Sequence, residues 1–501
     1  MTKIIEYIFV FTSVFGALNT LFAGGENLKK ENASSEFDIF NGKDDLKSAK
    51  TNTSSGIQMD IVVQKPFARD SIFFPDRDFM AMDNWIFTQF LRFTQKPKIS
   101  ETMSINLDFG LKSTTESKKQ ALNEMNKYFP VSGLMNSVHP MFENELSFLH
   151  FFIYDFSVNL SFLPTDTGTF FLTAGILPVK SGNSFYKNPV SFFERYLAPK
   201  NYLQEYSPLS FPAIKLDYIF NIYHLEILFV PEIAKSNLDK NSELSNISRY
   251  LYFTNYSNIL SVKNSLDFSD IITDVYFFWE NKPEKEIQNH FGFGHETSWR
   301  VFKDLHLNWQ MLISNGKPDY EVSTHSILNS TYYSFEARKN STEDYHLESL
   351  VSINFSGLDD FETSFGYYFN GYGLSGKQYR ELHNALEISK KGYASSGAIL
   401  KSLHMLFFAS VLTQFDLFSM NQHYVFMNIA SLQNMEFFSW GFSTFIALEQ
   451  FALMPILFAN FNVNTQTKVY FQLMANFGET GSVFSESPTA GSINGGIQFV
   501  F

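Results

Sequence analysis

The stretch Ile493-Asn494-Gly495-Gly496-Ile497-Gln498-Phe499-Val500-Phe501 ends the chain and indicates its fold better than any other segment. Side chains of an extended strand alternate between two faces, so Ile493, Ile497, Phe499 and Phe501 share one face. A strand that stops on an aromatic residue leaves no tail to cover its edge. The pattern therefore predicts that this strand closes a barrel against the first strand, with its apolar face toward lipid.

The same strand resembles the C-terminal signature of bacterial outer-membrane β-barrels, in which the insertion machinery reads a terminal Phe. The resemblance implies that Phe499 and Phe501 are a barrel-assembly signal, and that outer-membrane lipid and the barrel-insertion machinery are partners. Gly495 departs from the signature, where this position is usually apolar. We expect Phe501, Phe499 and Ile497 to meet lipid, with Gln498 and Gly496 inward. The alternative is an ordinary edge strand of a soluble β-protein.

The first residues predict export. Residues 1–3 form a weakly positive start, residues 7–18 are apolar, and Ala23 offers a small residue before a cut at Gly24. This order is typical of a secretory signal peptide over 1–23, with an uncleaved N-terminal anchor as the alternative. Residues 24–56 are polar without apolar periodicity, which predicts a disordered periplasmic segment. The barrel is expected over 57–501.

The composition narrows the class of protein. Aromatic residues make up 17% of the chain, while charged residues make up only 18%, below the roughly 25% of a typical soluble domain. The chain has no cysteine, which excludes disulfides and a lipid-modified cysteine. After the signal peptide no run approaches the ~20 apolar residues of a membrane helix. The net charge of −13 argues against nucleic-acid binding.

Strict alternation of apolar and polar residues dominates the remainder. It is clearest in 102–112, 305–314 and 468–477, and 214–229 divides into two strands around a tight turn near 221–223. The polar faces hold mostly Asn, Ser, Thr, Gln and Gly with scattered charges, as suits a hydrated lumen. We therefore predict an all-β, membrane-spanning antiparallel barrel with long external loops and an even number of strands, about 14–18. Further strand candidates are 84–94, 146–162, 168–177, 270–280, 290–302, 331–338, 344–355, 360–370, 402–413, 422–431, 436–447, 453–464 and 489–501.

Long connections interrupt these strands. Residues 117–128 predict a short helix, 232–268 and 371–400 are the other long connections, and 378–391 also has a helical pattern. Long loops of a membrane barrel face the outside.

The best local motif follows the strand candidate 168–177. Gly175 and Gly182 are followed by Asn188 and Pro189, with Phe192 and Phe193 next. The spacing resembles a pattern of porin-like outer-membrane proteins, although Ser181 and Ser191 replace the Trp and Asp of that pattern. Glycine and Asn-Pro would let the chain leave the wall sharply and fold back. We expect the loop-turn motif Gly175, Gly182, Asn188 and Pro189 to shape this loop.

Charges in the same loop are pore or constriction candidates: Lys180, Lys187, Glu194 and Arg195. Lys180, Lys187 and Arg195 would favour anions if the loop narrows the pore. A surface loop with ordinary solvated charges is the alternative.

The porin-like resemblance implies an outer-membrane channel for passive diffusion of small solutes, without cofactor or metal. One alternative is an adhesin or receptor acting through its surface loops. A transporter of hydrophobic substrates is a further alternative, although the Asn-Pro-Ala segment of that family is not found. Porins are often trimers, so a homotrimer is one expected state. No nucleophile elbow, phosphate loop or zinc-protease motif occurs, and we expect no enzyme.

Overall fold

A computed structural model of the chain describes residues 55–68, 85–114, 149–162, 168–178, 189–190, 210–231, 258–281, 289–316, 319–327, 330–338, 343–358, 361–395, 397–414, 420–431, 437–486 and 489–501. The chain divides into two units, Met1–Gly42 and Lys43–Phe501. The described residues all belong to the second unit. The predicted signal peptide and the helix predicted at 117–128 lie outside the described residues.

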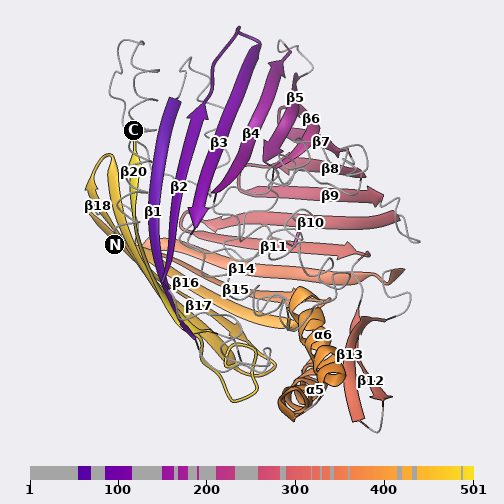
Figure 1. Cartoon of the computed structure of the whole chain (residues 1–501). Coiled ribbons are helices and arrows are strands. Elements are labelled where there is room, and N and C mark those ends of the chain that lie inside the picture. Colours follow the sequence, from indigo (N-terminus) through magenta and orange to yellow (C-terminus); the bar gives the residue numbers. More distant parts are fainter. Residues whose placement is uncertain are drawn as a thin grey trace, which may run out of the picture. The chain divides into compact units, whose positions relative to one another are not determined.

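The second unit is a closed antiparallel barrel of 18 strands (Figure 1). Each strand pairs with its neighbours along the chain, except that β11 pairs with β14. The strands are β1 (Ser55–Ala68), β2 (Ile86–Gln95), β3 (Met103–Thr114), β4 (Leu149–Ser161), β5 (Thr169–Pro178), β6 (Ser210–Phe220), β7 (Tyr223–Val230), β8 (Asn258–Asp267), β9 (Ile271–Asn281), β10 (Asn289–Phe302), β11 (Leu305–Ser314), β14 (His346–Leu358), β15 (Phe361–Asn370), β16 (His423–Ser431), β17 (Phe438–Ala447), β18 (Ala452–Asn464), β19 (Thr467–Ala475) and β20 (Thr489–Val500).

The last strand closes the barrel, as its sequence predicts. β20 pairs along β1, with Ile61 opposite Ile497 and Asp60 opposite Gln498. Beyond β20, Phe501 exchanges two backbone hydrogen bonds with Ile57. The Phe501 side chain is 56% exposed and its ring stacks on Phe499 at 6.3 Å between centroids. Full closure leaves neither strand with an unpaired edge.

The connections differ sharply between the two ends of the barrel. At the end that holds both termini of the barrel the turns are short, and β6 and β7 are joined by only two residues, Asn221 and Ile222. The strand ends joined by the long connections, 115–148, 179–209, 231–257 and 371–422, lie at the opposite end. In outer-membrane barrels the short turns face the periplasm and the long loops face outside.

Residues that pair directly across two strands point to the same side of the wall, so the registers assign each side chain to lipid or lumen. Large apolar side chains such as Phe156, Val275, Phe293 and Phe365 stand exposed on the outward positions. Of the acidic, lysine and arginine side chains described in the 18 strands, only Lys65 occupies an outward position. Its ammonium lies 5.9 Å from the Trp85 ring. The outer surface is therefore an apolar belt suited to lipid.

The alternating segments 102–112, 214–229, 305–314 and 468–477 fall on barrel strands, and the count of 18 lies within the predicted range. The helix predicted over 378–391 is confirmed within α5 (Gly376–Ser395). It starts with a capping box, because Ser375 and Gln378 exchange hydrogen bonds of 3.0 and 3.4 Å through backbone N–H and side-chain oxygen.

One strand assignment from the sequence is wrong, a second predicted strand lies outside the barrel, and one predicted connection contains a strand. Residues 402–413 lie in the helix α6 (Ala398–Gln414), because the run is apolar on all sides and so gives no strand period. Residues 331–338 fall on β13 (Ser330–Ala337), which pairs only with β12 (Tyr320–Ile327) in a separate hairpin. The stretch 232–268, read as a connection, contains β8, whose polar residues mask its alternation. No helix of the described residues is long and apolar enough to cross a membrane.

Candidate functional site in the barrel lumen

The inward positions of the strands carry a mixed but mainly acidic wall. Eleven carboxylates and five basic side chains with described atoms point inward, by the strand registers. Charged side chains pay a large desolvation cost in lipid, so their restriction to one side of the wall defines that side as the lumen. The carboxylates are Asp60, Asp108, Asp155, Asp217, Glu226, Asp267, Asp274, Glu280, Glu296, Glu348 and Glu362, and the basic residues are Arg92, Lys215, Lys263, Arg300 and Lys468.

One cluster of these charges spans β6 and β7. The Lys215 ammonium lies 3.1 Å from Asp217 and 3.6 Å from Glu226, and His224 Nε2 lies 3.0 Å from Asp217. Asp217, His224 and Glu226 have ligand-type atoms within 4.8 Å of one another, the one such group among the described residues. Because Lys215 already supplies a positive charge among them, the group holds together as an ion-pair network.

A second cluster spans β8 to β11. The Lys263 ammonium lies 2.8 Å from Asp274 and 5.5 Å from the centre of the Tyr276 ring. The Tyr276 hydroxyl lies between two carboxylates, 3.1 Å from Asp274 and 3.0 Å from Glu296. Gln310 donates to the other oxygen of Glu296 at 2.9 Å. These groups hold two carboxylates and one ammonium, so the cluster carries a negative excess.

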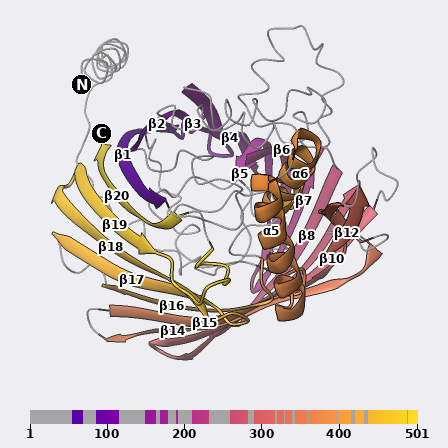
Figure 2. The same cartoon turned by 60° about the horizontal axis from the view of Figure 1, so that its bottom comes forward.

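On the opposite part of the wall a helical hairpin covers the lumen-facing side chains. Helices α5 and α6 lie across the ring of strands in Figure 2. Apolar residues of both helices form one buried cluster with inward residues of β14 to β18. Phe407 packs 6.0 Å from Tyr333 of β13, which places β13 over the same helix. The cluster includes Tyr379, Leu382, Leu386, Phe407, Phe408, Tyr368, Tyr424, Phe426, Phe445 and Met454.

The connection between β5 and β6 also enters the barrel at its described residues. Pro189 and Val190 are buried, and Val190 belongs to a cluster of inward residues that includes Tyr276, Phe278 and Leu312. A Cβ built on Gly294 of β10 would lie 3.4 Å from Val190. This close approach shows that residues 189–190 pack on the inner wall of β9 to β11.

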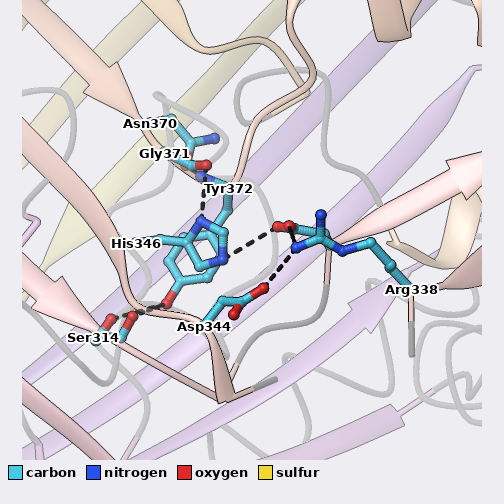
Figure 3. Close-up of polar contacts among 8 residues, drawn as sticks. Ser314, Arg338, Asp344, His346, Asn370, Gly371 and Tyr372 are labelled. Carbon is cyan, nitrogen blue, oxygen red and sulfur yellow. Dashed lines mark hydrogen bonds and ion pairs between the residues drawn. The ribbon is translucent and has the colours of Figure 1, made fainter. Parts of the chain in front are cut away.

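A polar cluster joins the β12–β13 hairpin to the barrel rim (Figure 3). Arg338 pairs with Asp319 at 2.8 Å and with Asp344 at 2.6 Å, and Asp319 lies 3.2 Å from His346 Nε2. The Tyr372 ring packs 4.4 Å from the His346 ring, and its hydroxyl donates to the Ser314 carbonyl at 2.7 Å. Tyr372 lies just before α5. The cluster therefore links the β12–β13 hairpin and the start of the α5–α6 hairpin to the barrel rim.

Exposure divides the inner wall into two sectors. In what we call the wet sector, β1 to β8, charged side chains keep contact with water: Arg92 is 29% exposed, Lys215 32% and Lys263 27%. In the covered sector, β9 to β11 and β14 to β20, inward side chains such as Glu296 and Tyr424 are almost fully buried. Arg300, near the end of β10 in the covered sector, is exposed as well. Water contact of the three basic side chains defines the wet sector.

The structure places the residues predicted from sequence only in part. Gly175 has φ +140° and a Cβ there would lie 2.2 Å from the Phe156 carbonyl oxygen, so this position requires glycine. Pro189 is buried beside Val190. Lys180, Gly182, Lys187, Asn188, Glu194 and Arg195 lie outside the described residues, and their roles stay predictions.

The carboxylate clusters of β6 to β11 were missed from the sequence, although a signal for them exists. Asp217, Glu226, Asp274 and Glu296 all occupy the polar phase of their strands. Likewise, Tyr424 and Phe426 interrupt the polar phase of β16, and such apolar residues on the inward side indicate that another element covers them.

The closed barrel, its apolar outer belt, its charged lumen and its unequal loop lengths are those of a membrane-spanning β-barrel of the outer-membrane type. No protein-family model and no curated protein sequence matches the chain. Among solved structures, it is similar to Acinetobacter baumannii OccAB4 at 10% identity and a TM-score of 0.46, over 91% of this chain and 99% of that one. It is also similar to Pseudomonas aeruginosa OccK11 (OpdR), at 8% identity and a TM-score of 0.45, over 89% and 95%. A triple mutant of the Rhodopseudomonas blastica porin matches at 8% identity and a TM-score of 0.37, over 90% and 100%.

Proposed function

We propose that this barrel is an outer-membrane channel through which small polar solutes diffuse passively. The wet sector carries the proposal, because Arg92, Lys215 and Lys263 keep water contact along the inner wall. Barrels of 16–18 strands are wide enough to hold an aqueous path between side chains. The α5–α6 hairpin and residues 189–190 narrow that path from the covered side.

Single-channel recording of the purified full chain in planar bilayers tests this proposal. We expect discrete open steps whose size rises with salt concentration, as for a water-filled pore. A correctly assembled barrel, shown by heat-modifiable migration, that never conducts contradicts the proposal. Binding of that silent barrel to cells or matrix would favour the adhesin or receptor alternative.

The loop that contains Lys180, Lys187 and Arg195 is proposed to set part of the charge at the constriction. Val190 is buried against the inner wall. This burial supports an inward course of the loop at residues 189–190, which lie between Lys187 and Arg195 in the sequence. Changing the three basic residues to Glu together should then reduce the relative permeability to anions. Unchanged ion selectivity in planar bilayers would assign these charges to an ordinary surface loop.

A further inference from the structure

Two buried oxygen atoms on neighbouring strands of the lumen wall have no hydrogen-bond donor. Ser265 of β8 and Asp274 of β9 are direct cross-strand partners. Ser265 is 8% exposed and Asp274 is 4% exposed. The Ser265 Oγ and Asp274 Oδ1 atoms are both buried without a partner. Directly opposed residues hold their Cβ atoms about 4.5–5.5 Å apart, so the two side chains are neighbours on the inner wall. A buried oxygen without a partner loses its hydration with no compensating contact, and a bound cation would restore one.

The charges around this pair favour a positive ligand. Glu296 of β10 is the partner of Asp274 on its other side and lies in hydrogen-bond contact with Tyr276. Lys263 occupies the second oxygen of Asp274 at 2.8 Å, which leaves Oδ1 for a ligand. Two carboxylates then face one ammonium.

The excess continues into the neighbouring strands. Lys263 also interacts electrostatically with Glu226, and Glu226 in turn shares Lys215 with Asp217. Four carboxylates thus surround two lysines across β6 to β10. The chain as a whole carries a net charge of −13, of the same sign as this excess.

We propose that Ser265, Asp274 and Glu296 bind a hard, oxygen-liganded cation at the edge of the wet sector, and that the channel consequently prefers cations to anions. Carboxylate and hydroxyl oxygens are the ligands such cations select, and rings of acidic side chains select cations in other channels. The preference rests on the proposed channel function, whereas the binding site can be measured without conduction.

Reversal potentials of the full chain under a KCl gradient test the preference. We expect K⁺ to permeate about threefold or more better than Cl⁻, as acidic pore linings cause. Asp274→Asn should lower this ratio at least about twofold. Glu101→Gln removes the same charge from the exposed turn between β2 and β3 and should leave the ratio unchanged. A wild-type channel that prefers Cl⁻, or equal ratios for both variants, overturns the inference.

Terbium luminescence reads the site even in a closed barrel. Tb³⁺ is a hard cation that tyrosine sensitises at short range, and the Tyr276 hydroxyl lies 3.1 Å from Asp274. Sensitised emission should fall in Asp274→Asn and in Glu296→Gln, and persist in Glu101→Gln. If the barrel does not conduct but the emission depends on Asp274, the cation site is supported and the channel function is refuted. If the barrel conducts but neither wall variant changes the emission, the channel function is supported and the cation site is refuted.

Discussion

Undocking the α5–α6 hairpin is the most informative perturbation of the lumen. Phe407 and Phe408 of α6 are 1% and 2% exposed, and their rings lie 6.2 Å apart within the cluster that holds the hairpin on the wall. Truncating one buried Phe to Ala removes about 3–5 kcal/mol of packing. Because the two rings contact each other within one cluster, their losses are coupled, and the double change should cost less than twice that value, roughly 5–8 kcal/mol.

The barrel itself should survive the double change Phe407→Ala/Phe408→Ala, because no strand hydrogen bond involves these side chains. We expect larger or noisier single-channel steps, since the undocked hairpin no longer narrows the lumen. Ile399→Ala is the matched control on the same helix, because Ile399 is 69% exposed and surface changes stay within about 0.5 kcal/mol. Wild-type conductance from a double variant whose α6 amides have lost hydrogen-exchange protection would refute the assignment of the hairpin as a constriction.

Three further predictions test other parts of the structure. Gly175→Val should impair barrel assembly, measured by heat-modifiable migration, because the Cβ would lie 2.2 Å from the Phe156 carbonyl oxygen; normal assembly would show that β4 and β5 can shift apart. Burial lowers the pKa of His404 in α6 below the 6.5 of a free imidazole, so the undocked hairpin binds the proton more readily than the docked one. Docking is therefore strongest above pH 6.5 and weakens as the pH falls toward the folded pKa, and hydrogen exchange of α6 should show this in the wild type and not in His404→Leu. Deleting Phe501 should reduce insertion into the outer membrane if the last strand is read as an assembly signal, and unaltered insertion without it would argue against that role.

The strands with two unlike faces could be predicted from sequence because lipid and lumen impose opposite demands on alternate residues. In β3, β11 and β19 this alternation is nearly complete, and the predicted segments match the observed strands. The strand β8 was not predicted, because Asn264 is a polar residue on its outward face. An apolar residue at this position would have completed the alternation.

The elements inside the barrel were harder to predict, because they depend on contacts between distant segments. The helix α6 is apolar on all sides because it packs on both α5 and β13, and its apolar residues join the cluster on the inner wall, so no side is left polar to give a helical period. The opposed oxygens of Ser265 and Asp274 depend on the register of β8 with β9, which no local pattern specifies. The sequence alone shows that these acidic residues lie on the polar face of their strands. It does not show which side chains they contact on neighbouring strands.

The central claim, that water and small solutes pass along the wet sector, is tested most directly by the single-channel conductance of the purified full chain. We predict discrete open steps that scale with salt concentration and that shrink when Arg92, in the wet sector, is replaced by Trp. An assembled barrel that shows no steps, or steps unaffected by this bulky substitution, would contradict it.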